Sequence, residues 1–207
     1  MMNNTPIVQS FHPSPIDRCE IYRYMKCAKP DREIDALIDS AIEITEGELR
    51  YDTTFITLPI VSIKSGDIDL GAVKVKSYDL EKALRDCNSV IIFAATLGLG
   101  IDRLIAKYGR IQPSLALCIQ ALGTERIEAL CDELCTYLRQ KYGNIRPRFS
   151  AGYGDLPLEF QREIFSLLDC HKSIGLTLNQ SLLMSPTKSV TAIIGIKNST
   201  DQKNEDT

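Results

Sequence analysis

The sequence predicts a single α+β domain in which a twisted antiparallel or mixed sheet packs against helices. Three observations support this class: apolar residues recur at helical spacing in some segments, other segments are rich in β-branched residues, and one short run is continuously apolar. The 207 residues show no internal repeat and no low-complexity linker. We therefore expect a folded domain over residues 15–196, a flexible N-terminal arm at 1–14 and a disordered polar tail at 197–207.

Helical segments are indicated by apolar residues at i, i+3 and i+4 spacing and by residues that begin helices. The expected helices span residues 15–25, 31–49, 79–86, 101–107, 114–141 and 158–168, with one more helical turn at 169–175. Ser77 is the expected N-cap of the third helix, because its hydroxyl can accept a hydrogen bond from a backbone N–H of the first turn. The longest helix carries an ordinary core stripe and a second row of small or mildly polar residues. That second row consists of Ala121, Thr124, Glu128, Cys131 and Cys135.

Strands are indicated by β-branched and apolar runs. Residues 53–63 and 68–76 flank the turn Ser65-Gly66-Asp67 and are expected to form an antiparallel hairpin. The continuous apolar run 89–95 is typical of a central strand that is covered on both faces. Two further strands are expected at 176–184 and 189–196.

Composition excludes several classes of protein. A net charge of −3 provides no basic excess for phosphates, so we expect no nucleic-acid partner. No apolar run approaches the ~20 residues of a membrane helix, and Met1–Ser14 lack the pattern of a secretory signal. We therefore expect a cytoplasmic protein that does not contact a membrane. The seven cysteines include no Cys-x-x-Cys motif, and no histidine lies near Cys131 and Cys135, the pair one helical turn apart that could suit a metal, so we expect buried free thiols and no metal site.

The stretch from Arg148 to Asp155 has the composition of a binding loop. Arg148 offers a planar fork of donors for a carboxylate or phosphate. Gly152 and Gly154 leave the backbone bare on either side of Tyr153, so that the amides around Ala151 to Tyr153 are expected to point at a bound molecule. The other reading is a surface turn that happens to contain two glycines.

Glu128 is the one acid in the middle of the second row of the long helix. An unpaired acid on a partly covered face is costly, so Glu128 needs a partner. Its position alone leaves two alternatives open. It pairs with a neighbour of Arg126 or another surface cation, or it receives an ammonium group from a ligand.

Several pieces of the sequence occur in an order that resembles a known family. The pieces are residues 93–98, residues 120–122 followed by Glu128, the motif Arg148-x-x-x-Gly152-Tyr153, residues 167–169 followed by 172–178, and residues 181–190. Together they resemble the activation domain of cobalamin-dependent methionine synthase, in particular its small stand-alone relatives. The likeness extends from Val90 to Ile196 and implies the same fold.

The resemblance implies that the chain binds S-adenosylmethionine. Arg148 would bind the carboxylate of this ligand and Glu128 its ammonium group. Backbone groups of Ser150, Ala151 and Gly152 would meet the adenosine or methionine portion, and Tyr153 would flank the ligand.

The resemblance also implies a role in methionine biosynthesis. Oxidised, inactive cobalamin of methionine synthase is restored by one electron from a flavodoxin- or ferredoxin-type donor and a methyl group from S-adenosylmethionine. The cobalamin would arrive on a partner, a corrinoid-bearing methionine synthase or similar protein. We therefore expect no catalytic residue of the usual kind, and a component of a methyltransferase activity rather than a self-sufficient enzyme.

Two other functions stay open at this point. The family's full-length members continue with a segment whose tyrosine pair contributes to the ligand site, and they often have proline where this chain has Ala151. These differences favour a non-catalytic interaction module with the same fold that has lost the ligand. A free-standing methyltransferase acting on a small substrate is the remaining alternative, although the sequence offers no acid–base pair for it.

Overall fold

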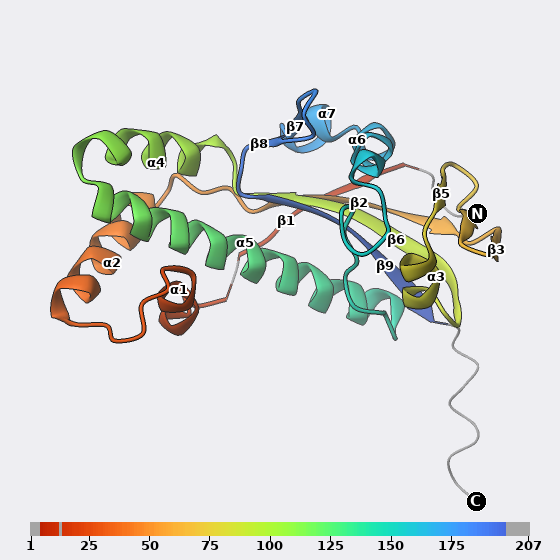
Figure 1. Cartoon of the computed structure of the whole chain (residues 1–207), viewed down its shortest axis with the longest axis horizontal. Coiled ribbons are helices and arrows are strands. Elements are labelled where there is room, and N and C mark those ends of the chain that lie inside the picture. Colours follow the sequence, from red (N-terminus) through yellow and green to blue (C-terminus); the bar gives the residue numbers. More distant parts are fainter. Residues whose placement is uncertain (1–4, 13, 198–207) are drawn as a thin grey trace, which may run out of the picture.

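The computed structural model describes residues 5–12 and 14–197 and confirms the predicted α+β class (Figure 1). The helices are α1 (Arg18–Tyr24), α2 (Arg32–Thr45), α3 (Tyr78–Ala83), α4 (Leu99–Ile111), α5 (Pro113–Tyr142), α6 (Gln161–Leu168) and α7 (Cys170–Ile174), with a 3-10 turn η1 (Leu158–Phe160). The strands are β1 (Ile7–Ser10), β2 (Asp52–Pro59), β3 (Ser62–Lys64), β4 (Asp67–Asp69), β5 (Lys74–Lys76), β6 (Cys87–Thr96), β7 (Thr177–Leu178), β8 (Met184–Ser185) and β9 (Ser189–Lys197). Each predicted helical segment overlaps an observed helix, with ends that differ by a few residues.

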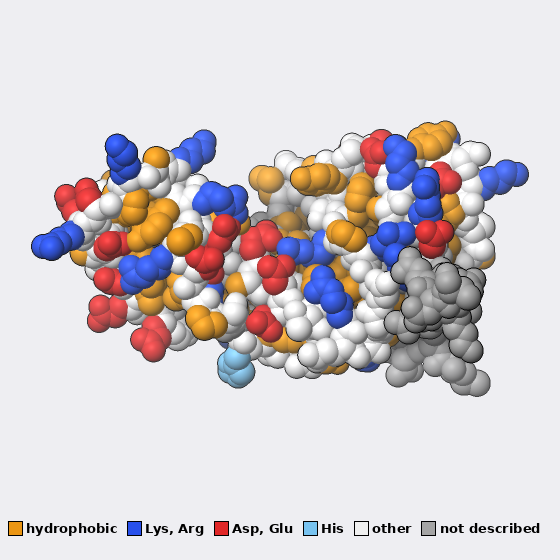
Figure 2. All heavy atoms as spheres, turned by 90° about the horizontal axis from the view of Figure 1, so that it is seen from below, with side chains coloured by type: hydrophobic (Ala, Val, Ile, Leu, Met, Phe, Trp, Pro, Cys, Tyr) orange, Lys and Arg blue, Asp and Glu red, His pale blue; other side chains and the backbone are white. Residues whose placement is uncertain are grey.

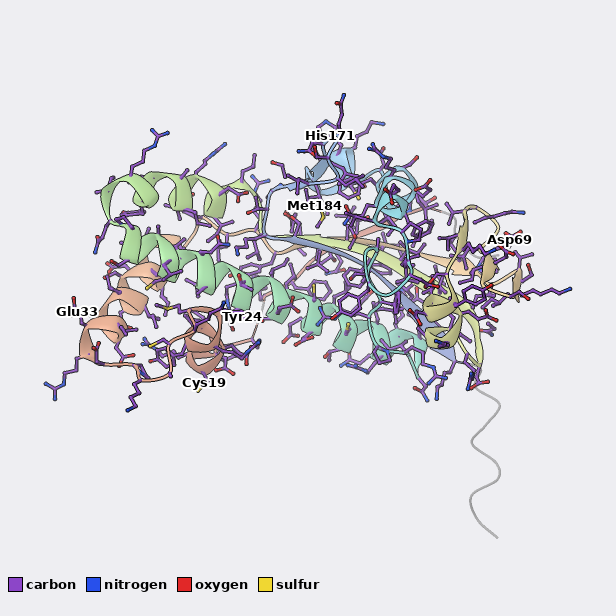
Figure 3. The ribbon with its side chains drawn as sticks, viewed as in Figure 1. Cys19, Tyr24, Glu33, Asp69, His171 and Met184 are labelled. Atoms are coloured by element: carbon purple, nitrogen blue, oxygen red, sulfur yellow. The ribbon has the colours of Figure 1, made fainter. Side chains whose placement is uncertain are left out.

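The main sheet has the strand order β1-β2-β6-β9, and all of its pairs are antiparallel. On one face Phe55 and Phe93 pack with the apolar side of α5 and with α1 and α2. On the other face Ile92 and Ile193 pack with α6 and α7. Strand β6 is therefore buried on both faces, as the apolar run predicts. Figure 1 shows α5 on one side of this sheet and α6 and α7 on the other, and Figure 3 shows the side chains that fill the space between them.

The predicted hairpin between residues 53–63 and 68–76 is confirmed only next to its turn, where Ser62–Lys64 (β3) pair antiparallel with Asp67–Asp69 (β4), and it is wrong for the longer strand before Pro59. Strand β2 pairs with β1 and β6, whereas β3, β4 and β5 form a separate three-stranded antiparallel sheet. The two strands expected in residues 176–196 also differ from the prediction, because β7 pairs with β8 in a short ribbon and β9 pairs with β6. For β2 and β9 the local pattern identifies a strand, and contacts with distant segments select its partners.

The expectation of a loose arm at residues 1–14 is wrong for Ile7–Ser10, which form the edge strand β1. Ser10 donates a hydrogen bond from Oγ to Asp52 at 2.7 Å, and Thr53 donates from Oγ1 to the carbonyl of Gln9 at 2.7 Å. These bonds add to the strand pairing and hold the segment on β2. At the other end, Lys197 belongs to β9, and the remaining residues of the predicted tail, 198–207, lie outside the described residues.

A buried ion pair attaches the segment before α1 to α5. Glu125 and Arg126 are only 5% and 4% exposed, and the Arg126 guanidinium donates to both carboxylate oxygens of Glu125. Arg126 also donates from Nη1 to the carbonyl of Ser14 at 2.7 Å, while Glu125 accepts from the backbone N–H of Asp17 at 3.1 Å. The charges of the pair are thus satisfied by each other and by the backbone that leads into α1.

Candidate functional site

Arg148 lies on a segment that runs beside β9 after α5 ends. The backbone N–H of Phe149 donates to Ile193 at 2.9 Å, and the N–H of Ile193 donates back to Phe149 at 2.8 Å. The N–H of Arg146 donates to Gly195 at 2.7 Å. The segment therefore extends the sheet past β9, which fixes the backbone of Arg148 next to α5.

The guanidinium of Arg148 contacts two acids of α5. Its Nη2 donates to Glu128 Oε2 at 3.2 Å and to Asp132 Oδ1 at 3.0 Å. Glu128 and Asp132 are four residues apart, so they lie on the same helix face, one turn apart. The Arg148 side chain is 26% exposed, which leaves it half-buried yet accessible to a ligand.

Glu128 therefore pairs with a cation inside the protein. Its partner is Arg148, which belongs to a different segment and not to the neighbours of Arg126 on α5. Arg126 itself forms an ion pair with Glu125 in the interior. Spacing along one helix could not reveal this pair, since Arg148 approaches from a different segment. Sequence reasoning also missed Asp132, although its position one turn beyond Glu128 is a signal that could have found it.

Two cysteines lie beneath the Arg148 side chain on the same row of α5. Cys131 is buried, and burial raises the pKa of its thiol to about 12, while the nearby Arg148 charge acts in the opposite direction. Burial likewise raises the pKa of Cys135. Both thiols are thus protonated at neutral pH and serve as small apolar groups in the wall of the site. The prediction of buried free thiols is confirmed for Cys118, Cys131, Cys135 and Cys170, whereas Cys19 is exposed and Cys27 and Cys87 are half-buried.

The glycine-containing turn follows Arg148 directly. Gly152 has a φ of +85°, which favours glycine, and an added Cβ would lie 3.1 Å from Leu158 Cδ1. The N–H of Gly152 donates to Leu156 at 2.9 Å, and the N–H of Tyr153 donates to Ser150 at 3.1 Å. The expectation that these amides point at a ligand is therefore wrong for Gly152 and Tyr153, because both N–H groups close the turn itself.

The other predicted residues lie around this turn. Ser150 is half-buried, Ala151 is buried, and Gly152 is exposed. Tyr153 is 72% exposed, and its ring meets that of Phe149 edge-on with centroids 6.3 Å apart. The turn thus presents a bare backbone and an exposed aromatic ring a few residues after Arg148, beside the core that Phe149 and Ala151 share with α6 and α7.

Asp155, the acid at the end of the stretch, has a structural role that the sequence did not indicate. It accepts hydrogen bonds from the Ser77 hydroxyl and from the backbone N–H groups of Tyr78 at 2.8 Å and Asp79 at 3.1 Å. Ser77 in turn accepts from the N–H of Leu80 at 2.9 Å, which confirms its predicted role as the N-cap of α3. Asp155 therefore ties the site turn to the start of α3.

Tyr24 is a further residue near the cluster that the sequence analysis did not single out. It follows the exposed Arg23 on α1, and Figure 3 shows its side chain beside α5. Burial is the main cause that raises its pKa, and the Glu128 carboxylate adds to the rise against the opposing effect of Arg23. No local pattern distinguishes this tyrosine from others in the chain.

Figure 3 also places His171 and Cys19 at opposite edges of the molecule. Within residues 5–12 and 14–197, no group of three or more His, Cys, Asp and Glu side chains has the arrangement of a metal site. Over the same residues, no helix has both the length and the apolar character needed to cross a membrane.

The fold and the site define the chain as an α+β protein of the activation-domain type, in which the segment that leads into a glycine turn places an arginine against two acids of one long helix. Residues 80–202 match the family described as vitamin B12 dependent methionine synthase, activation domain, and the chain belongs to this family.

Among solved structures, the crystal structure of the MetH reactivation domain bound to AdoHcy is similar to this chain, with a TM-score of 0.67 and 17% sequence identity. The match covers 96% of this chain and 81% of that one. This likeness confirms that the fold is that of the methionine synthase activation domain. No curated protein matches the sequence closely enough to identify a relative.

Proposed function

We propose that this chain binds S-adenosylmethionine and supports the reductive methylation of cobalamin in a separate methionine synthase or other corrinoid protein. Family membership supports the general role. The observation that carries the proposal for the ligand is the half-buried Arg148 guanidinium, which two acids of α5 hold just before the glycine turn in the chain.

Arg148 is suited to the ligand carboxylate. Among the described residues, both of its side-chain hydrogen bonds use Nη2, so Nε and Nη1 keep their capacity to donate. A carboxylate that forms two parallel hydrogen bonds would use Nε with Nη2 or Nη1 with Nη2, so it would share Nη2 with the acids of α5 or displace one of them. The bonds to Glu128 and Asp132 orient the group before the ligand arrives, which reduces the entropy lost on binding.

The acids of the cluster are suited to the positive charges of the ligand. One guanidinium and two carboxylates leave an excess of one negative charge at the cluster. S-adenosylmethionine carries a carboxylate, an ammonium and a sulfonium, so its net charge is opposite in sign. Glu128 is the expected partner of the ammonium group, because it is less exposed than Asp132, with 43% against 73% of the side chain accessible.

The turn is suited to the adenosine portion. Gly152 has no side chain and is exposed, which permits close approach of a ligand to the backbone. The ring of Tyr153 offers a face on which a planar base can stack. Because two N–H groups of the turn are already bonded, we expect its ligand contacts to come from Ser150 and Ala151 and from van der Waals contact with Gly152.

The sulfonium of the ligand supplies an activated methyl group, so the protein needs no nucleophile or general base of its own. The chain's contribution is to hold the methyl donor in position for a corrinoid on a partner protein. The electron for the reductive step would come from a flavodoxin- or ferredoxin-type donor. In this role the chain is a component of a methyltransferase activity.

Calorimetric titration of the purified protein with S-adenosylmethionine, and separately with S-adenosylhomocysteine, tests the proposal. Saturable binding with a Kd on the order of micromolar supports it. The absence of heat and of thermal stabilisation at millimolar ligand would overturn ligand binding by the free chain and favour the interaction module. Consumption of S-adenosylmethionine without any corrinoid partner would instead indicate a free-standing methyltransferase.

A further inference from the structure

Lys188, just before β9, has an unusual environment for a lysine. The residue is only 7% exposed. Its side chain passes Gly123 of α5, where an added Cβ would lie 3.1 Å from Lys188 Cε and 3.0 Å from a side-chain carbon of Ile101. A glycine at position 123 therefore leaves the space through which this lysine reaches the surface of α5.

The ammonium group of Lys188 has little compensation inside the protein. Its Nζ donates to Thr124 Oγ1 at 2.7 Å, which uses one of three N–H donors. This is its one side-chain hydrogen bond to the described residues. The acid that acts on its charge is Asp102, whose two oxygens accept from the N–H and the hydroxyl of Thr187. Burial lowers the pKa of Lys188, and Asp102 opposes this shift only in part.

The Lys188 ammonium lies on the same face of α5 as the Arg148 cluster. Thr124 precedes Glu128 by four residues, so the two side chains lie on one face, about 6 Å apart along the helix axis. Figure 2 shows acidic and basic side chains intermingled across the middle of this side of the molecule. Its outline is indented between the end that carries α2 and α4 and the body that carries the sheet.

We propose that Lys188 is a second ligand-binding residue of this site, which donates from Nζ to acceptor atoms of the nucleoside part of the ligand. The inference rests on the proposed binding of S-adenosylmethionine. Arg148 and Glu128 account for the carboxylate and ammonium of the methionine part, and Lys188 lies one helical turn away from them. The ribose hydroxyls and the ring nitrogens of adenine are neutral acceptors, which can satisfy a buried ammonium without adding charge.

Binding of two ligands to two variants separates this role from that of Arg148. S-adenosylmethionine contains both parts of the proposed ligand, whereas 5′-methylthioadenosine contains the nucleoside part without the amino-acid part. We expect Lys188→Met to weaken both ligands by about tenfold, through the loss of one charge-assisted hydrogen bond. Arg148→Ala should weaken S-adenosylmethionine and leave 5′-methylthioadenosine almost unchanged. Lys172→Met, at an exposed lysine paired with Asp169, is the control for loss of a positive charge.

The outcomes distinguish this inference from the function on which it rests. If the wild-type protein binds neither ligand, the proposed function and the role of Lys188 both fail. If S-adenosylmethionine binds and Lys188→Met has the affinity of the wild type for both ligands, Lys188 has only a structural role and the inference is wrong.

A second measurement serves if Lys188→Met does not fold. In wild-type protein with ¹³C-labelled lysine, the Cε resonance that disappears in Lys188→Arg should shift on addition of 5′-methylthioadenosine, and that of Lys172 should not. An unchanged Lys188 resonance at saturating ligand would overturn the inference.

Discussion

The Arg148 guanidinium lies 3.2 Å from the Glu128 carboxylate and so joins the segment after α5 to the middle of that helix. The two residues are twenty positions apart in the chain. Their contact requires that α5 end near Tyr142 and that the chain return along β9. A pair formed in this way holds a cation and an anion side by side at an accessible surface, an arrangement suited to a ligand that carries both charges.

Replacement of Arg148 by alanine is expected to weaken binding of S-adenosylmethionine by roughly 2–4 kcal/mol, because the ligand carboxylate loses a charge-assisted contact with two hydrogen bonds. The free energy of unfolding should change by less than about 1 kcal/mol, because the ion pairs of Arg148 are partly exposed to solvent. Calorimetric titration and urea denaturation measure the two quantities. Arg23→Ala, which removes an arginine from an exposed pair with Glu20, is the control. Equal affinity in Arg148→Ala and the wild type would exclude Arg148 from the site.

Replacement of Glu128 by glutamine keeps the shape of the side chain and removes its charge. If Glu128 binds the ligand ammonium, the affinities for S-adenosylmethionine and S-adenosylhomocysteine should both fall about tenfold, because both ligands carry this group. Asp132→Asn is the matched control and should have a smaller effect, because Asp132 is more exposed. A loss confined to S-adenosylmethionine would show that Glu128 acts on the sulfonium and would contradict its assignment to the ammonium.

Replacement of Glu125 by leucine should be strongly destabilising. Arg126 would remain 4% exposed without its carboxylate partner, and leaving such a charge uncompensated costs about 3–5 kcal/mol. The double variant Glu125→Leu/Arg126→Leu removes both charges and should be more stable than the single variant. Urea denaturation of the two variants measures this difference. A single variant as stable as the wild type would mean that water or a rearranged backbone satisfies Arg126.

The role of Asp155 predicts a pH-dependent contribution to stability. The hydrogen bond from the Ser77 hydroxyl, followed by those from backbone N–H groups, lowers the pKa of Asp155. A lowered pKa in the folded state means that the ionised form stabilises the fold above the ordinary pKa of about 3.9, and that this contribution is lost as pH falls through the lower folded value. Asp155→Asn should therefore have a lower melting temperature than the wild type at neutral pH, and the difference should shrink in acid.

Melting curves recorded from neutral to acidic pH measure this effect. Asp67→Asn on β4 is a suitable control, because it removes an exposed acid that does not cap α3. If the difference between Asp155→Asn and the wild type is the same at every pH, ionised Asp155 does not hold the site turn on α3.

The candidate site was only partly predictable for a physical reason. Arg148, Gly152 and Tyr153 are close in sequence, so their grouping follows from the chain itself. Glu128 and Asp132 are on another element, and their contact with Arg148 exists only once that element has packed. Lys188 was expected simply in a turn between two strands, and its burial depends on the space left by Gly123 on a distant helix.

The sequence by itself determined the α+β class, the positions of the helices, the buried central strand and the N-cap at Ser77. These features depend on local periodicity and on hydrogen bonds within a few residues, which neighbouring residues specify. The tertiary structure alone decided that β2 pairs with β1 and β6, that β9 lies against β6, and that Arg148 meets Glu128. Strand partners and long-range ion pairs depend on which surfaces meet when the whole core is buried, and the same local pattern is compatible with several such arrangements.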